Sequence, residues 1–124
     1  MNWKFEYIND GDYVRITDEG VFNIEDHRRK MKELASQDFW DPGVNLLFDC
    51  TKLDFGKTEY QDIRDLALEF ANQNELIGCG KIAILMKSIA DFGKGRQFEL
   101  LTDEKICANV SIFIDEGQAL RWLE

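Results

Sequence analysis

Several features that would mark a membrane, secreted or metal-binding protein are missing from this sequence. No stretch approaches the roughly 20 apolar residues of a membrane-spanning helix, and residues 1–6 contain no basic leader with an apolar core behind it. We therefore expect a cytoplasmic protein without a membrane span. The many carboxylates do not occur at the spacing of a zinc site or a calcium loop, so no metal and no cofactor are predicted.

Histidine is almost absent, and this limits the catalytic chemistry that the chain could perform. A Ser-His or Cys-His pair would have to use His27, the only histidine. It lies in the middle of a predicted helix and not at the end of a strand, so we expect it to be packed or at the surface edge. Asp49 and Asp115 could form a hydrolytic carboxylate pair at adjacent strand ends. That is the alternative to our prediction, which is a protein without catalytic residues.

Cysteine is scarce and basic residues are outnumbered. Cys50, Cys79 and Cys107 are widely spaced, form no CxxC motif and are odd in number, so we expect three reduced thiols. A reactive thiol is the alternative for Cys79, which lies between two glycines. The chain has 15 Lys and Arg against 24 Asp and Glu, a formal charge of -9. Nucleic acid is therefore excluded as a partner, because it is bound through clustered cations.

The apolar periodicity predicts an N-terminal hairpin followed by helix and strand units. Residues 3–8 and 13–17 alternate around the turn residues 9–11, and mostly apolar runs at 44–50, 81–86 and 110–114 are typical of parallel strands. Four helices are expected: after an Asn23 cap, after a capping box of Thr58 and Gln61, over 88–104, and after an Asp115 cap. Because no linker interrupts the pattern, residues 1–124 are predicted to form one α/β domain with a five-stranded mixed sheet.

Two segments carry a family resemblance. Residues 91–99 read Asp-Phe-Gly-Lys-Gly-Arg-Gln-Phe-Glu, and residues 119–123 read Ala-Leu-Arg-Trp-Leu. These resemble the "aFG…R.FE.L" and "eALxWL" motifs of the SpoIIAA-like branch of the STAS superfamily. The resemblance implies a SpoIIAA/STAS-like fold. Since this branch is related in fold to CRAL-TRIO lipid-transfer domains, it also implies an apolar pocket at the strand ends.

The carboxyl ends of the parallel strands are where a ligand is expected, because loops open there between helix starts. The segments that arrive at this rim are 49–58, 87–96 and 115–117. The tentative ligand-binding residues on them are Asp49, Phe55, Lys87, Ser88, Phe92, Lys94, Arg96 and Asp115.

The cations at 87, 94 and 96 could hold an anionic group beside a helix start. The other interpretation is structural. Arg96 shares a helical face with Ile89, Phe92 and Leu100, so it would be partly buried and would pair with Asp49, Asp91 or Asp115. The nearby glycines would then only permit close packing of the helix on the sheet.

Thr58 is the candidate phosphoacceptor. Anti-sigma-factor antagonists of this superfamily carry a phosphorylated Ser in a pattern like "D-x-S-x-V-x-F-x-D-S-S-G", and residues 49–60 resemble its first half. Lys57 replaces the acidic residue before the acceptor, and Glu59-Tyr60 replace Ser-Gly after it. Thr58 is therefore interpreted chiefly as a helix cap.

The sequence thus predicts a non-enzymatic binding module whose ligand is an apolar or anionic, lipid-like small molecule. The alternative is a protein-interaction or phospho-switch module of the antagonist type. Phe39 and Trp40 precede a Pro-Gly turn and would mark a protein partner or a homodimer surface if they are exposed; otherwise Trp40 covers the sheet edge.

Overall fold

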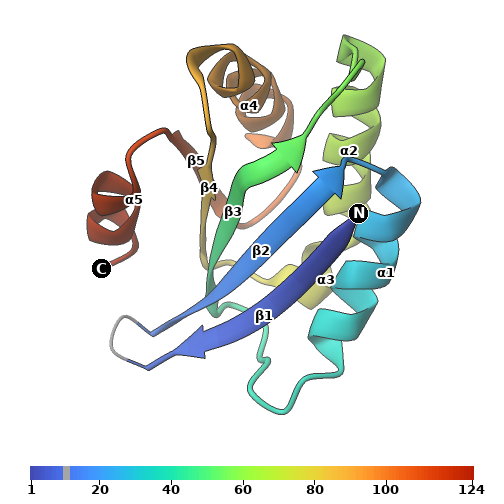
Figure 1. Ribbon diagram of the computed structural model, residues 1–124. Coiled ribbons are helices and arrows are strands. Elements are labelled where there is room, and N and C mark those ends of the chain that lie inside the picture. The colour runs from blue at the N-terminus through green and yellow to red at the C-terminus, as the bar shows by residue number, and fades with distance from the viewer. Residues whose placement is uncertain (10–11) are drawn as a thin grey trace.

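The computed structural model describes residues 1–9 and 12–124, and a five-stranded mixed sheet runs through them (Figure 1). The strands are β1 (Asn2–Ile8), β2 (Tyr13–Val21), β3 (Asn45–Asp54), β4 (Lys81–Leu85) and β5 (Asn109–Phe113). They lie in chain order, with β1 antiparallel to β2 and every later neighbour parallel. The predicted mixed sheet is confirmed. The turn predicted at residues 9–11 falls partly on residues 10 and 11, which lie outside the described residues.

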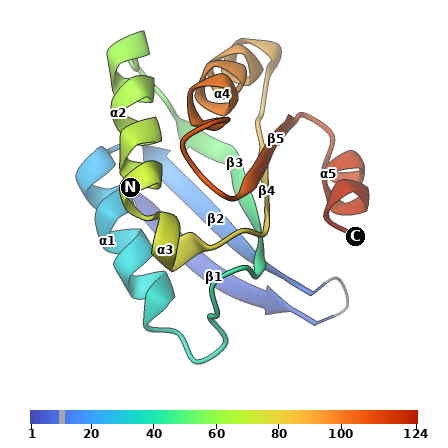
Figure 2. The same ribbon diagram turned by 180° about the vertical axis from the view of Figure 1, so that it is seen from behind.

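Helices cover both faces of the sheet unequally. One face carries α1 (Ile24–Ala35), α2 (Tyr60–Asn72), α3 (Asn74–Ile77) and α4 (Ile89–Thr102), and the other carries α5 (Glu116–Leu123) (Figure 2). α3 is a single turn that the sequence did not predict, so five helices stand where four were expected. No helix in the described part of the chain is long and apolar enough to cross a membrane.

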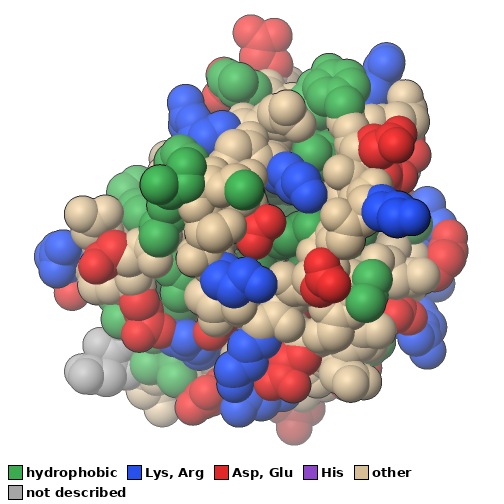
Figure 3. Space-filling model, turned by 45° about the horizontal axis from the view of Figure 1, so that its top comes forward, with side chains coloured by type: hydrophobic (Ala, Val, Ile, Leu, Met, Phe, Trp, Pro, Cys, Tyr) green, Lys and Arg blue, Asp and Glu red, His purple; other side chains and the backbone are tan. Residues whose placement is uncertain are grey.

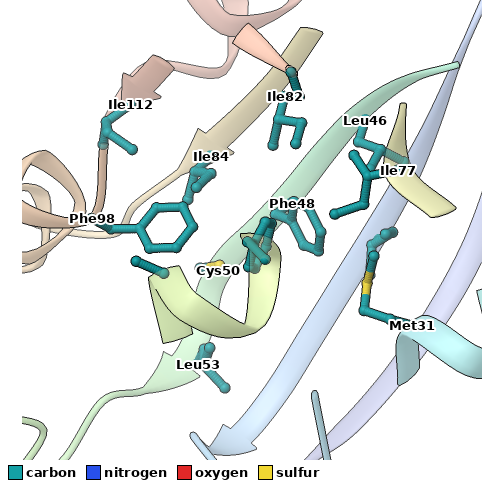
Figure 4. Packing of buried hydrophobic residues seen from close by; sticks show 14 of the residues in the cluster. Met31, Leu46, Phe48, Cys50, Leu53, Ile77, Ile82, Ile84, Phe98 and Ile112 are labelled. Carbon is teal, nitrogen blue, oxygen red and sulfur yellow. The ribbon is translucent and has the colours of Figure 1, made fainter. Parts of the chain in front are cut away.

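Alternation along the strands divides the core into two clusters. Side chains such as Leu46 and Phe48 face the four-helix side and form the larger cluster, whereas Leu47 faces α5. Figure 4 shows how the larger cluster brings Ile84 of β4 and Ile112 of β5 to Phe98 of α4. This packing leaves the carboxyl ends of β3 and β4 side by side beneath α2 and α4.

Side-chain caps position the starts of the longer helices. Asn23 Oδ1 accepts a hydrogen bond from the backbone N–H of Asp26 (3.0 Å), and Asp115 Oδ1 accepts one from Gln118 (2.8 Å). Both predicted caps are confirmed. The capping box predicted for Thr58 and Gln61 is wrong, because the box is formed one residue later by Glu59 and Asp62.

The prediction of three reduced cysteines is also wrong. Cys79 and Cys107 form a disulfide with a Cα–Cα distance of 4.7 Å, while Cys50 is buried and free. The two half-cystines are 28 residues apart in sequence. Because β4 and β5 are parallel neighbours, however, the loops that lead into them end at the same edge of the sheet. Sequence spacing alone did not reveal that closeness.

A pair of glycines in α4 offers a matched test of the packing. A methyl group at Gly95 would lie 2.8 Å from Ile112 Cγ2, whereas one at Gly93 would meet nothing within 4 Å. We expect Gly93→Ala to raise the free energy of unfolding by about 1 kcal/mol through helix propensity. Gly95→Ala should lower it by about 1 kcal/mol, because overpacking of roughly 1–3 kcal/mol outweighs the same gain. Urea unfolding of both variants checks this, and equal shifts would contradict it.

Candidate functional site

A cavity of about 70 Å³ lies between the sheet and helices α1, α2 and α4. Its volume is several times the roughly 10–15 Å³ that one water molecule needs. The wall is almost entirely apolar, and its hydrophobic side chains include Phe48, Cys50, Leu53, Ile63, Leu66 and Phe70. Such a cavity holds water poorly and favours an apolar occupant.

A more polar groove of about 320 Å³ lies beside the cavity at the carboxyl ends of β2 and β3. It runs between residues 21–24, which lead into α1, and the loop that precedes α2. The two hollows share four lining residues, Phe22, Phe55, Thr58 and Asp62. Figure 3 looks onto this end of the molecule, where hydrophobic side chains show in a depression between charged ones. The groove therefore adjoins the cavity along these shared residues.

An irregularity in β3 shapes the cavity wall. Thr17 of β2 pairs with Asp49 of β3, but Glu19 pairs with Lys52, so β3 carries one extra residue between these pairs. In a regular strand Cys50 and Leu53 would point to opposite faces. The bulge turns both toward the helices, where they line the cavity together (Figure 4).

A buried ion pair forms the polar part of the wall. Lys30 Nζ of α1 donates to Asp18 Oδ2 of β2 at 2.9 Å, and each residue is only 2% exposed. Lys30 Nζ also lies 4.9 Å from the centroid of the Phe48 ring. Asp18 Oδ1 is buried and has no hydrogen-bond partner among the described residues. Burial raises the pKa of Asp18 above its usual 3.8, although the Lys30 ammonium opposes the shift.

His27 lies beside this pair and belongs to the same wall. Its ring stacks on Phe70 with a centroid distance of 5.0 Å, and Nε2 lies 3.2 Å from Gln73 Oε1. Because the Gln73 amide nitrogen donates to Glu69, its oxygen faces the ring, and His27 Nε2 is the donor. Burial, with a further contribution from the Lys30 and Arg28 charges, lowers the pKa of His27 to about 3. The imidazole is therefore neutral in the folded protein.

The neutral state of His27 predicts a specific loss of stability in acid. Between pH 6.5 and 3 the His27 imidazole binds a proton in the unfolded chain but not in the folded chain. The free energy of unfolding therefore falls as pH falls. We expect a loss of about 2 kcal/mol between pH 7 and pH 5, at a limiting slope of about 1.36 kcal/mol per pH unit. Urea midpoints of the wild type and of His27→Gln at both pH values measure it. A variant with an unchanged pH dependence would contradict the assignment.

Cys50 is not a nucleophile in this site. Its thiol is buried in the cavity wall, and burial raises its pKa well above the ordinary value of 9.0. A thiol in this state is unreactive. Among residues 1–9 and 12–124, no group of three or more His, Cys, Asp and Glu side chains could hold a metal ion.

Three of the residues that sequence analysis proposed lie at the site. Phe55 and Thr58 line both the cavity and the groove, and Lys94 of α4 lines the cavity. Lys94 Nζ lies 6.0 Å from the centroid of the Phe55 ring. The loop after β3 therefore meets the first part of α4, so segments 49–58 and 87–96 lie at the same rim as predicted. The Thr58 hydroxyl donates to the carbonyl of Phe55.

Asp49 and Asp115 lie elsewhere. Asp49 points to the α5 side of the sheet, where Oδ2 accepts from Arg15 at 2.6 Å and Oδ1 accepts from Thr51. Arg15 also pairs with Glu116 at 2.6 Å. Burial alone would raise the pKa of Asp49, but these hydrogen bonds lower it. Asp115 is the cap of α5. Both carboxylates thus have structural partners on the far side of the sheet.

The remaining candidates are also outside the cavity wall. Ser88 caps α4 by accepting from the Asp91 N–H, Phe92 packs against the main core, and Lys87 is exposed. The expectation that Arg96 is partly buried and pairs with Asp49, Asp91 or Asp115 is wrong. Its side chain is 50% exposed and pairs with Glu99 one turn along α4, because Gly95 and Phe98 occupy the face that meets the sheet.

The aromatic pair before Pro42 packs inside the molecule. Phe39 stacks on Tyr7 with a centroid distance of 5.8 Å, and Trp40 Nε1 donates to the carbonyl of Leu76 at 3.2 Å. Both side chains are partly buried against the larger core cluster. Trp40 therefore covers the edge of the core, as one of the two interpretations held.

Sequence analysis missed Asp18 and Lys30, although a signal for each was present. Asp18 continues the alternation of Val14 and Ile16, which places a carboxylate on the buried face of β2. Lys30 lies three residues after His27 on the buried stripe of α1. Opposite charges at two inward positions indicate a buried ion pair, but the predicted strand ended at residue 17.

Comparisons with known proteins bear on the fold. No protein-family model matches the sequence, and no curated protein matches it either. The structure is similar to a crystal structure from Shewanella loihica PV-4, described as an uncharacterized protein of the DUF3478 family with a SpoIIAA-like fold. The two chains are 21% identical with a TM-score of 0.63, over 99% of this chain and 93% of that chain. This chain therefore has the SpoIIAA-like fold that its motifs at 91–99 and 119–123 predicted.

Proposed function

We propose that this protein is a non-enzymatic binding module that takes up an apolar small molecule between its sheet and helices α1, α2 and α4. The observation that carries the proposal is the apolar cavity with an adjoining groove at the strand ends. Burying apolar ligand surface there contributes a favourable free energy of roughly 25 cal/mol per Å². The cavity is already formed in the folded chain, which reduces the entropic cost of binding.

The charges around the site support binding over catalysis. The one histidine is neutral and hydrogen-bonded to Gln73, and the one thiol in the wall is buried. Neither has a partner that would make it a nucleophile or a general base at neutral pH. The cations that were candidates for an anionic ligand are dispersed, since only Lys94 lines the cavity. An apolar ligand is therefore favoured over an anionic one.

The surroundings of Thr58 disfavour the phospho-switch alternative. The Thr58 hydroxyl is engaged with the Phe55 carbonyl, and the helix start beside it carries Glu59 and Asp62. A phosphate added at Thr58 would meet these two carboxylates, which repel it. A phospho-switch at Thr58 is therefore disfavoured as a second function.

Binding can be tested with heptyl methyl ether, an apolar probe without a hydrogen-bond donor, titrated into the protein and followed by NMR chemical shifts. Leu66→Trp would fill the cavity and is expected to weaken binding by at least about tenfold. Leu68→Trp is the matched control, because Leu68 lies on the same helix, is 46% exposed and is not part of the cavity wall. Its affinity should equal that of the wild type.

Two further results bear on the same proposal. Native mass spectrometry of freshly purified protein should reveal a lipid-sized adduct that Leu66→Trp lacks. Thr58→Phe at the shared wall of cavity and groove provides a second block if Leu66→Trp is poorly folded. No saturable binding by the wild type, together with a clean ligand-free mass, would refute the function.

A cytoplasmic location is part of the proposal. The Cys79–Cys107 disulfide makes it testable, because structural disulfides are rare in reducing compartments. If the protein resides in the cytoplasm, rapid alkylation in intact cells should find Cys79 and Cys107 as free thiols. A fully oxidised pair would favour an oxidising compartment instead.

A further inference from the structure

Among the described residues of the cavity wall, Asp18 Oδ1 is a buried oxygen without any hydrogen-bond partner. Asp18 Oδ2 accepts a hydrogen bond from Lys30, but Oδ1 has no partner among the described residues. Asp18 is only 2% exposed. Asp18 belongs to the wall of the cavity. A buried carboxylate oxygen without a donor is costly, because it gives up water and receives nothing in return. A ligand that donates to this atom would recover that loss.

We propose that the ligand is a neutral molecule with an apolar body and one hydroxyl or N–H group, which donates a hydrogen bond to Asp18 Oδ1. This inference rests on the proposed function and adds the polar chemistry of the ligand and its orientation. The donor end lies inside the cavity beside the ion pair. The apolar body extends along Phe48, Leu53 and Leu66 toward the groove.

The charges of the wall favour a neutral donor over an ionic one. Asp18 and Lys30 together carry no net charge, so a cationic ligand would leave an excess positive charge in an apolar cavity. An anionic head group would meet Oδ1, which can only accept hydrogen bonds, and would be repelled by it. His27 adds no charge because it is neutral. The Met1 ammonium, on another residue of the wall, is paired with Asp26, and Lys94 and Asp62 are not buried.

Two isomers separate the contribution of the donor from that of the apolar body. n-Octanol and heptyl methyl ether have the same molecular formula, but only the alcohol can donate a hydrogen bond. Because a hydrogen bond to a charged acceptor is strong, we expect n-octanol to bind the wild-type protein roughly tenfold to a hundredfold more tightly than the ether. Octanoate should bind more weakly than n-octanol. Isothermal titration or NMR on the unmodified protein measures all three.

The double variant Asp18→Val/Lys30→Met removes the ion pair without leaving a buried charge behind. It should bind the two isomers with equal affinity while keeping the affinity of the wild type for the ether within a few-fold. Lys52→Met is the control, because Lys52 pairs only with exposed Glu19 and does not line the cavity. It should retain the full preference for the alcohol.

Each outcome has one meaning. Equal affinities for the two isomers in the wild type would overturn this inference and leave the apolar pocket standing. Tighter binding of octanoate, or a preference for n-octanol that survives in the double variant, would also overturn it. If neither isomer binds at all, the proposed function itself fails. A bound water as the only partner of Asp18 Oδ1, unaffected by n-octanol, would likewise contradict the assignment.

Discussion

Lys30→Met is expected to lower the free energy of unfolding by about 3–5 kcal/mol at pH 7. The variant keeps a long apolar side chain against Phe48 but leaves the Asp18 carboxylate buried at 2% exposure with neither oxygen paired. Taking up a proton limits the cost, since protonating a carboxyl of ordinary pKa 3.8 at pH 7 requires about 4 kcal/mol. Urea denaturation followed by circular dichroism measures the change.

The pH dependence of this loss identifies its cause. A carboxyl whose pKa is raised by folding binds its proton more tightly in the folded chain. Acidification therefore raises the free energy of unfolding of Lys30→Met. The difference between the wild type and Lys30→Met should therefore shrink by about 2 kcal/mol from pH 7 to pH 5. His27 contributes to both proteins, and most of its contribution cancels in the difference because burial, and not the Lys30 charge, is the main cause of its low pKa. A loss that does not vary with pH would indicate a packing defect and not an unpaired charge.

The double variant Asp18→Val/Lys30→Met serves as the control for the same experiment. Replacing both partners of a buried ion pair by apolar residues is often neutral or stabilising by about 1–4 kcal/mol. We expect the double variant to be at least as stable as the wild type at pH 7. Stability would then recover even though two polar residues are lost, which would show that the Asp18–Lys30 pair is not needed for folding.

The fold could be predicted because local signals and tertiary contacts agree. Alternating side chains defined β1 and the start of β2, and Asn23 and Asp115 cap helices where a hydrogen-bonding side chain precedes an apolar stripe. Parallel neighbours then followed from the order of strands and helices. The Thr58 error was a shift of one residue, which local preference does not resolve because Glu59 can form the same box with Asp62.

The site was harder to predict, because it depends on which face of the sheet a side chain occupies. Asp49 lies within β3 and Phe55 directly follows it, yet Asp49 faces α5 and Phe55 lines the cavity. The bulge between Asp49 and Lys52 changes that assignment, and no residue type in the segment indicates it. Arg96 failed for a related reason, since the glycine at 95 rather than the aromatic at 92 meets β5.

The two faces of the sheet therefore differ in how their buried charges are paired. On the α5 side, Arg15 of β2 joins Asp49 of β3 to Glu116 of α5 through two ion pairs. On the other side, three helices surround a cavity whose carboxylate oxygen is unpaired. A ligand that approaches the rim meets satisfied groups on one face and an unsatisfied acceptor on the other. Recognition of the polar end of a ligand is for this reason expected at β2 and α1, which carry Asp18 and Lys30.

Reduction of the Cys79–Cys107 disulfide is expected to lower the free energy of unfolding by about 3–4 kcal/mol. The bond closes a loop of 28 residues, and releasing it restores that much chain entropy to the unfolded state. Cys79→Ser/Cys107→Ser should match the reduced wild type and show no response to dithiothreitol.

In reduced native protein, iodoacetamide should label the exposed Cys79 and Cys107 but spare Cys50, whose thiol is buried. Because the hydrogen bonds from Asn109 to Gly80 and from Cys107 to Asn74 still join the same loops, the reduced protein should keep its helix content and its affinity for heptyl methyl ether. Loss of binding on reduction would instead show that the disulfide holds α2 and α4 over the cavity.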